Sequence, residues 1–196
     1  MSLTYVTSNY GKYLNVKKHF EDNNLSLDYF SYDLTEPDIN DIEIISKAKV
    51  TEAYEILKKP CFVADSGFYI IDYPNNPNYP GAFVKRSGVS SNIDKLLNDL
   101  KNTKDRRAYF LDCLTFYDGK EYHTFFGKSE GIISHEKKGQ ASEKSLSNLW
   151  YIFIPNNHSK TLAEMSDYER NHRHDNHTSA TESFIAWYKK EYKKSK

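Results

Sequence analysis

The chain has 196 residues, which is enough to bury one sizeable core. Its 27 lysines and arginines balance 27 aspartates and glutamates, so no bulk field draws it to DNA or to anionic lipid. No apolar stretch approaches the roughly 18 residues of a membrane helix, and the start lacks a signal pattern. Cys61 and Cys113 lie in apolar runs without a CxxC partner. We therefore expect a soluble, cytoplasmic protein with reduced, buried thiols.

The first part of the chain alternates strand-like and helical patterns. Strands are expected at 3–7, 25–32 and 61–64, with helices between them from Lys12 to Asn24 and from Asp38 to Leu57. Asp38 is expected to cap the second helix. The apolar face of that helix would consist of Ile42, Ile45, Ala53 and Ile56.

The second part begins with a long irregular loop at 74–81, because prolines and asparagines there break both periodicities. Asp118-Gly119 is a hairpin signal between strands at 107–117 and 121–126. The other expected elements are strands at 131–133 and 149–154 and helices at 93–100, 161–168 and 184–192. The run at 68–72 is expected either to continue the strand at 61–64 or to pair with it. This order of elements predicts an α/β fold with a mixed sheet.

The segment Phe62–Phe68 is the most informative for function. An apolar run ends in Asp65, and the turn residues Ser66 and Gly67 follow at once. This pattern is typical of a buried strand that delivers a carboxylate to the rim of a sheet. A site for a nucleoside triphosphate also needs cations and backbone N–H groups for the phosphates. Mg²⁺ needs one or two carboxylates, which Asp65 and Glu36 could supply.

Six segments occur in an order that resembles the inosine triphosphate pyrophosphatase family along nearly the whole length. Each motif is weak alone, and their order is the evidence for the fold. The segments are Thr7-Ser8-Asn9-Tyr10-Gly11-Lys12, Asp33-Leu34-Thr35-Glu36, Lys47-Ala48, Ala64-Asp65-Ser66-Gly67, Pro80-Gly81-Ala82-Phe83-Val84-Lys85 and Lys160-Thr161-Leu162-Ala163-Glu164-Met165, with Glu169-Arg170-Asn171 after the last.

The resemblance implies a Mg²⁺-dependent enzyme that cleaves a nucleoside triphosphate to a monophosphate and pyrophosphate. It implies Asp65 as metal-binding carboxylate or base and Glu36 as second metal ligand. It also implies an elongated mixed sheet flanked by helices, two lobes with a central nucleotide-binding cleft in a single domain over 1–196, and a homodimer. By position in the motifs, the substrate-binding residues would be Thr7, Ser8, Asn9, Lys12, Lys47, Ser66, Lys85 and Arg170.

The chain departs from the family at the residues that recognise the base. Ser147 stands where the family has the aromatic that packs on the base, and Trp150 where it has an aspartate. The family's S-H-R motif falls in 171–178, where no alignment restores it. Ala64 replaces the first acid of an acidic pair. We therefore expect an altered base specificity.

Two other classes of protein are alternatives to the enzyme. A nucleotide-binding protein that keeps this fold but has lost the chemistry is motivated by Ala64 and the changed S-H-R motif. A nucleic-acid-binding module is disfavoured by the zero formal charge. The run His172–His177 could suggest a transition-metal site, but it has no helical i, i+4 pair and its polar surroundings favour a loop. Because this segment stands where the family has its S-H-R loop, the resemblance implies that the loop covers the nucleotide pocket.

Overall fold

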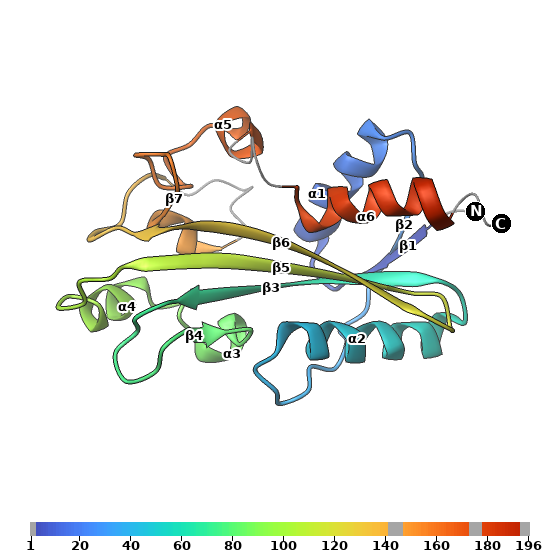
Figure 1. Cartoon of the computed structure of the whole chain (residues 1–196), viewed down its shortest axis with the longest axis horizontal. Coiled ribbons are helices and arrows are strands. Elements are labelled where there is room, and N and C mark those ends of the chain that lie inside the picture. The colour runs from blue at the N-terminus through green and yellow to red at the C-terminus, as the bar shows by residue number, and fades with distance from the viewer. Residues whose placement is uncertain (1–2, 141–146, 173–177, 193–196) are drawn as a thin grey trace. The chain divides into compact units, whose positions relative to one another are not determined.

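The computed structural model describes residues 3–140, 147–172 and 178–192. It contains a seven-stranded mixed sheet with the order β2-β1-β3-β5-β6-β7, and β4 pairs with β3 off this path (Figure 1). Strand β1 (Leu3–Val6) is parallel to β2 (Leu27–Phe30) and to β3 (Cys61–Ile70). The predicted α/β fold with a mixed sheet is confirmed.

The remaining elements follow the same chain order. The other strands are β4 (Tyr79–Gly81), β5 (Arg107–Tyr117), β6 (Tyr122–Ile133) and β7 (Phe153–Pro155). The α-helices are α1 (Tyr10–Asp22), α2 (Ile42–Leu57), α3 (Val84–Ser87), α4 (Ile93–Asp99), α5 (Asp167–His172) and α6 (Ala180–Trp187). A 3₁₀ turn η1 (Asn148–Tyr151) precedes β7, and a π-helical turn η2 (Tyr188–Tyr192) follows α6.

Several predicted boundaries are wrong. The run at 131–133 is the end of β6 and not a separate strand. The run at 68–72 continues the strand at 61–64 as β3, which is one of the two alternatives expected. Part of the loop at 74–81 forms the short strand β4, and much of 149–154 is the turn η1. The helix expected at 161–168 begins only at Asp167. Before it, the Glu164 carboxylate accepts a hydrogen bond from the Thr161 N–H and holds a turn.

The cap of α2 is Asp41, not Asp38. The Asp41 carboxylate accepts hydrogen bonds from the N–H groups of Glu43 and Ile44, which have no partner inside the helix. Ile56 was expected on the buried face but is 41% exposed. The face that is buried consists of Ile42, Ile45, Ser46, Val50 and Ala53.

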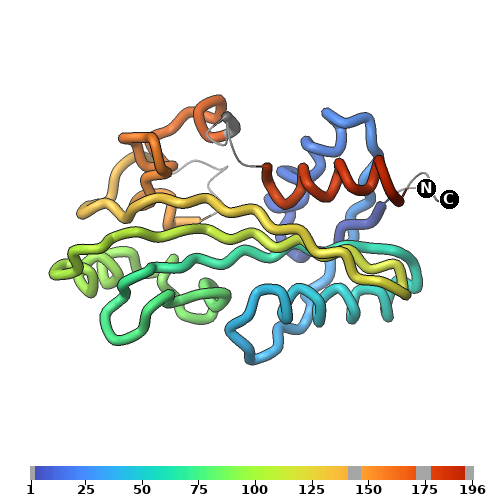
Figure 2. The backbone as a smooth tube through the Cα atoms, in the orientation of Figure 1, coloured from blue at the N-terminus to red at the C-terminus, as the bar shows by residue number. Residues whose placement is uncertain are grey.

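The chain divides into two compact units. The first comprises Met1–Ser66, Asp112–Gly127 and Thr178–Lys196. In it, α1 and α6 lie side by side on one face of the strands, and α2 covers the other face (Figures 1 and 2). Side chains of β3 alternate between these faces, so Phe62 packs with α1 and α6, whereas Cys61 and Val63 pack toward α2.

The second unit comprises Gly67–Leu111 and Lys128–His177. Its core joins α4 and η1 to one face of its strands, and Phe68, Phe110 and Phe153 meet there as tilted or edge-on ring pairs. The buried members of this core are Phe68, Ile70, Val89, Ile93, Leu96, Leu100, Ala108, Ile133, Leu149, Ile152, Phe153, Leu162 and Met165.

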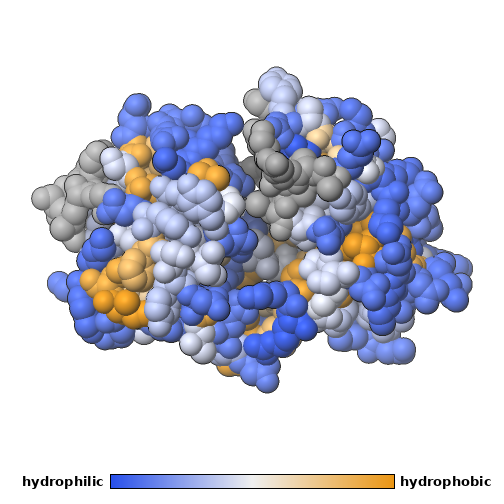
Figure 3. All heavy atoms as spheres, turned by 180° about the vertical axis from the view of Figure 1, so that it is seen from behind, coloured by the Kyte–Doolittle hydropathy of each residue, from blue (hydrophilic) through white to orange (hydrophobic). Residues whose placement is uncertain are grey.

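The helices of the described residues are too short or too polar for any of them to cross a membrane. The face of the molecule opposite to Figure 1 is largely hydrophilic, with small apolar areas separated by polar side chains (Figure 3).

Candidate functional site

The loop between β1 and α1 is shaped by its own side chains. The Thr7 hydroxyl accepts a hydrogen bond from the Asn9 N–H at 3.1 Å, and the Asn9 side chain accepts one from the Lys12 N–H at 3.0 Å. The Ser8 hydroxyl donates to the Asp33 carboxylate at 3.2 Å. Thr7, Ser8 and Asn9 therefore fix the backbone at the start of α1, where the N–H groups and the helix dipole favour an anion.

Lys12, in the first turn of α1, reaches to β3. Its ammonium donates to the carbonyl oxygen of Ala64 at 3.4 Å. Strand β1 ends at Val6 and pairs with β3 only at Cys61 and Phe62. The edge of β3 beyond this point therefore faces the loop, and Lys12 places a positive charge on it.

Asp65 occupies the next position of β3 and faces α2. The alternation of the strand puts it on the side of Cys61 and Val63, and its residue exposure is only 9%. The Lys49 ammonium of α2 lies 2.5 Å from Asp65 Oδ1 and 3.1 Å from Glu36 Oε1. One lysine thus bridges two carboxylates that are 29 positions apart in the chain.

The electrostatics of this group keep Lys49 charged. Burial lowers the pKa of the Lys49 ammonium, but the neighbouring Asp65 and Glu36 carboxylates outweigh it, so the pKa is raised. The loop that carries Glu36 is anchored to the same helix, because the Glu52 carboxylate accepts a hydrogen bond from the Thr35 N–H at 2.8 Å.

The Asp65 carboxylate has spare capacity to bind a ligand. Its Oδ2 atom is buried and has no hydrogen-bond partner among the described residues, which costs free energy unless a ligand satisfies it. Two carboxylate groups suit a hard cation that also takes phosphate oxygens and water. Within the described residues no group of three His, Cys, Asp or Glu side chains could hold a metal. Glu36 and Asp65 therefore fit a cation that is completed by its substrate.

Lys47, the lysine named from the sequence, lies elsewhere on α2. It pairs with Glu43 one turn earlier, at 2.6 Å, and 43% of its side chain is exposed. Two helical positions differ by about 200° of rotation, so Lys47 and Lys49 point to different sides of the helix. The structure brings Lys49, and not Lys47, to Asp65.

Ser66 faces the opposite side of β3 from Asp65. Its hydroxyl donates to Asp112 Oδ1 on the neighbouring strand β5 at 2.5 Å. Asp112 alternates with Leu114 and Phe116, which pack with α1 and α6, so both side chains lie on the α1 face. Asp112 is not among the residues that were predicted from the sequence. The signal that could have identified it is a carboxylate in the middle of the apolar run from Phe110 to Phe116.

The remaining predicted substrate residues lie in the second unit. Lys85 is an exposed residue in the short helix α3. Arg170 lies on α5, and its guanidinium donates to the carbonyls of Leu162 and Met165 and pairs with Asp167. Only 12% of its side chain is exposed. In this structure Arg170 therefore joins α5 to the turn before it.

Ser147 and Trp150, the two residues that differ from the family in the base-recognition segment, make contacts within the second unit. The Ser147 hydroxyl accepts a hydrogen bond from the Leu149 N–H and caps η1. Trp150 is partly buried against the second core, and the Arg170 guanidinium lies 5.3 Å from its ring centroid. The positions to which the S-H-R motif aligned, 174–178, lie almost wholly outside the described residues, as does most of the histidine-rich run.

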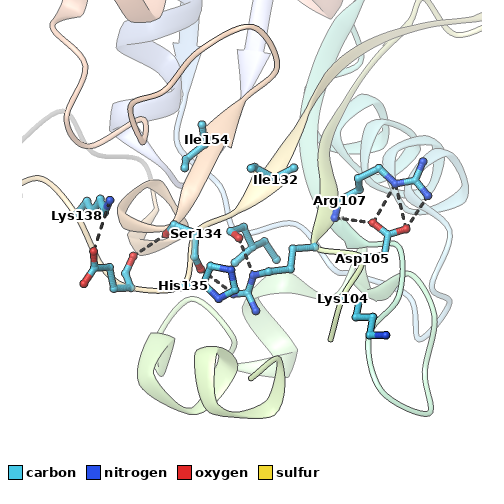
Figure 4. A pocket seen from close by; sticks show the side chains of 11 residues that line it. Lys104, Asp105, Arg107, Ile132, Ser134, His135, Lys138 and Ile154 are labelled. Atoms are coloured by element: carbon cyan, nitrogen blue, oxygen red, sulfur yellow. Dashed lines mark hydrogen bonds and ion pairs between the residues drawn. The ribbon is translucent and has the colours of Figure 1, made fainter. Parts of the chain in front are cut away.

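A pocket of about 550 Å³ lies away from these residues, within the second unit (Figure 4). Its rim carries Arg107 paired with Asp105 and Lys138 paired with Glu136. Ile132 and Ile154, which are register partners on β6 and β7, form an apolar wall. None of the residues predicted for the nucleotide site lines this pocket.

A model of the Ham1 family matches residues 3–187 of the chain. The chain belongs to the Ham1 family. It is 36% identical over 170 residues to the dITP/XTP pyrophosphatase of Saccharolobus solfataricus, covering 85% of this chain and 83% of that protein. It is 30% identical over 195 residues to the enzyme of the same name from Thermococcus kodakarensis, covering 98% and 100%.

A eukaryotic relative of this Ham1 family member is the inosine triphosphate pyrophosphatase of Schizosaccharomyces pombe. It is 33% identical over 175 residues, covering 87% of this chain and 86% of that protein. The family and the class of enzyme predicted from the ordered motifs are confirmed by these relatives.

Solved structures agree on the fold of the Ham1 family. A HAM1 protein from Coxiella burnetii matches with a TM-score of 0.79 at 20% identity, covering 95% of this chain and 97% of that chain. The Ham1 protein of Staphylococcus aureus matches with a TM-score of 0.74 at 24% identity, covering 95% and 98%.

Proposed function

We propose that this chain is a Mg²⁺-dependent nucleoside triphosphate pyrophosphatase that removes non-standard or modified nucleotides. It would release a nucleoside monophosphate and pyrophosphate. The observation that carries the proposal is the group of Lys49, Asp65 and Glu36, with Asp65 next to Ala64, whose carbonyl accepts a hydrogen bond from Lys12 of α1. Relatives named dITP/XTP pyrophosphatase support the reaction class.

The triphosphate would lie between the start of α1 and the free edge of β3. Backbone N–H groups of the first turn and the ammonium of Lys12 would neutralise the phosphate oxygens. Lys49 would supply a second positive charge from the other face of the strand. In the transition state this charge stabilises the pyrophosphate leaving group as its bond to the α-phosphorus breaks.

Glu36 and Asp65 would hold Mg²⁺, with phosphate oxygens and water as the other ligands. When bound, the ion neutralises charge on the triphosphate. Asp65 would also orient the attacking water or accept its proton, since its Oδ2 atom has no hydrogen-bond partner in the part of the chain that the structure describes. Lys85 of the second unit remains a proposed phosphate contact.

The base preference would differ from that of the relatives. Ser147 caps η1, and Trp150 is covered by Arg170, so neither offers the aromatic face or the carboxylate expected there. Losing hydrogen-bond partners matched to a base can change discrimination by about 10⁴-fold. The rival is a catalytically impaired nucleotide-binding protein, which Ala64 favours because the carboxylate of the acidic pair is absent there.

The test is to incubate the purified protein with Mg²⁺ and a panel of nucleoside triphosphates and to measure pyrophosphate. The panel contains inosine, xanthosine, standard and modified pyrimidine forms. We expect pyrophosphate and monophosphate from at least one, and a loss of about 10²-fold or more in Asp65→Asn. Asp94→Asn, an exposed carboxylate on α4, is the matched control. Unchanged turnover in Asp65→Asn would remove Asp65 from the mechanism, and nucleotide binding without turnover would favour the rival.

We further propose that the two units form a single domain and that the protein is a cytoplasmic homodimer without nucleic acid among its partners. The balanced charge supports the last point. Ile132, 46% exposed, and its register partner Ile154 could contribute apolar area to an interface between copies. Light scattering of the purified protein measures the oligomeric state, and a monomer at micromolar concentration would contradict the dimer.

A further inference from the structure

The pocket of the second unit carries more positive than negative charge (Figure 4). Its lining includes two lysines and two arginines but only two carboxylates, although the whole chain has no net charge. Both carboxylates already have a cation, since Asp105 pairs with Arg107 at 2.6 Å and Glu136 pairs with Lys138 at 3.5 Å. The pocket therefore keeps two positive charges that no carboxylate of its lining neutralises.

One of these charges, the Arg106 guanidinium, is buried without a counter-ion. Only 8% of the residue is exposed. Three of its five N–H groups donate to the carbonyls of Leu100, Ile133 and Ser134, and no carboxylate among the described residues pairs with it. Buried charges in proteins are usually paired, because a charge that is removed from water needs compensation. Because Arg106 lines the pocket, an anion bound there would supply the missing charge and accept hydrogen bonds.

Two further polar side chains of the pocket are available to a ligand. Lys104 and His135 are exposed, and neither has a hydrogen bond or an ion pair within the part of the chain that the structure describes. Figure 4 shows the apolar wall of Ile132 and Ile154 across from His135. The pocket thus combines donors and positive charge with an apolar surface, and its volume of about 550 Å³ is in the range of sites for small molecules.

We propose that this pocket is a second ligand site, which binds a small organic anion. Arg106, Lys104 and His135 hold the acidic group of this ligand, and its apolar part packs on Ile132 and Ile154. A carboxylate and a phosphate monoester both have acceptor oxygens that suit a guanidinium. None of the residues of the proposed nucleotide site lines the pocket, so binding here does not depend on the proposed reaction.

The experiment measures the Kd of four probes by isothermal titration calorimetry. Phenyl phosphate and benzoate carry both an anion and a ring, whereas inorganic phosphate lacks the ring and benzamide lacks the charge. We expect phenyl phosphate to bind about tenfold more tightly than inorganic phosphate, or benzoate about tenfold more tightly than benzamide. The pair that shows the difference identifies the acidic group. Equal Kd values within both pairs, or no binding of either complete probe up to about 10 mM, would overturn the proposal.

Variants at exposed positions test the residues without the folding cost of removing a buried arginine. Lys104→Met should weaken binding of the preferred probe about fivefold, because an ion pair with the ligand is lost. Lys137→Met is the matched control, since Lys137 is an exposed lysine that pairs with Asp94 and does not line the pocket. Ile132→Thr should weaken binding about threefold by removing apolar contact area. Equal losses in Lys104→Met and Lys137→Met would show unspecific attraction by surface charge and would overturn the proposal.

Two further measurements locate the probe. A phosphate monoester could also bind at the proposed nucleotide site, so Lys12→Met is titrated as well. A loss in Lys12→Met without a loss in Lys104→Met would place the probe at the nucleotide site and overturn the inference. The methyl resonances of Ile132 and Ile154 should shift when the aromatic ring of the probe packs on them, and unshifted resonances at saturation would contradict the inference. Pyrophosphate release is measured separately, and its absence would overturn the proposed reaction and leave this second site standing.

Discussion

Lys49 of α2 lies 2.5 Å from Asp65 of β3, and this contact brings a helix and a strand together at the candidate site. The pair is largely shielded from solvent, since 14% of the lysine side chain and 12% of the aspartate side chain are exposed. Shielding strengthens the interaction between the two charges, and it makes the loss of either partner costly.

Replacing Lys49 should therefore have a much larger effect than replacing Lys47. In Lys49→Met, the Asp65 and Glu36 carboxylates would repel each other and the site would lose a positive charge. We expect turnover to fall about 10²-fold. Lys47→Met removes an exposed lysine from the same helix and should leave turnover nearly unchanged. Steady-state pyrophosphate release with the preferred nucleotide measures both.

The comparison also tests whether the motif or the contact identifies the functional lysine. An equal loss of turnover in both variants would mean that the lysine-alanine motif, rather than the contact with Asp65, marks the functional residue. Thermal unfolding of both variants should accompany the kinetics, because Lys49→Met leaves the buried Asp65 carboxylate without its cation.

The Glu169 carboxylate should make the thermal stability of the protein depend on pH in the acid range. Its carboxylate pairs with Lys160 at 2.7 Å and accepts a hydrogen bond from the Ser166 N–H at 2.7 Å. These contacts lower the pKa of the Glu169 carboxyl from 4.5 to about 2, and the contact with Lys160 has the largest effect. A lowered pKa means that the stabilisation is complete above pH 4.5 and is lost as the pH falls toward 2. The Tm of Glu169→Gln should therefore fall less than that of the wild type across this range.

A second variant checks the origin of the shift. Lys160→Met removes the cation but keeps the hydrogen bond from Ser166, so Glu169 should be protonated at a higher pH. The loss of stability on acidification should therefore begin at a higher pH than in the wild type. Identical Tm curves against pH for the wild type and Glu169→Gln would show that this carboxylate does not contribute to acid unfolding.

Arg106 should be a major stabilising residue of the second unit. It is 8% exposed, and its guanidinium donates to the carbonyls of Leu100, Ile133 and Ser134 at 2.7–2.8 Å. Burial lowers the pKa of the guanidinium, as expected for a charge removed from water. Arg106→Met would leave three carbonyls without their donor, and we expect a loss of about 2–4 kcal/mol in the free energy of unfolding.

Arg107→Met is the matched control for this prediction. Arg107 is the next residue, but it is exposed and pairs with Asp105 at the rim of the pocket (Figure 4). Exposed ion pairs are worth little, so its free energy of unfolding should stay close to that of the wild type. Denaturant unfolding compares the two, and equal losses would contradict the role of Arg106.

The fold was predictable to the level of element order because hydrophobic periodicity is a local signal. The three residues of α1 whose spacing predicts a buried face, Tyr13, Val16 and Phe20, are all buried. Boundaries were less predictable. Asp38 and Asp41 are equally good caps in sequence, and the start of α2 depends on which residues its partners bury.

Site residues that belong to short sequence motifs were predictable. Site residues that are brought together by the packing of separate elements were less predictable. Asp65 directly follows an apolar run, so its place in the sheet was visible in the sequence, but the turn expected at Ser66 and Gly67 is wrong because β3 continues to Ile70. The choice between Lys47 and Lys49 depends on the rotation of α2 against β3, which no local pattern encodes. Asp112 is brought to Ser66 by the pairing of β3 with β5, across 46 residues of sequence.

The aromatic cluster of the first unit joins the two ends of the described chain. Phe184 of α6 packs against Phe20 of α1 and Phe62 of β3. During synthesis on the ribosome, α1 and β3 emerge more than 100 residues before α6 does. Their apolar faces must wait for that helix, so the first unit completes its core only after α6 has emerged. Folding on the ribosome is thereby delayed at the end that carries Asp65, and chaperones that shield exposed aromatic surface would act in that interval.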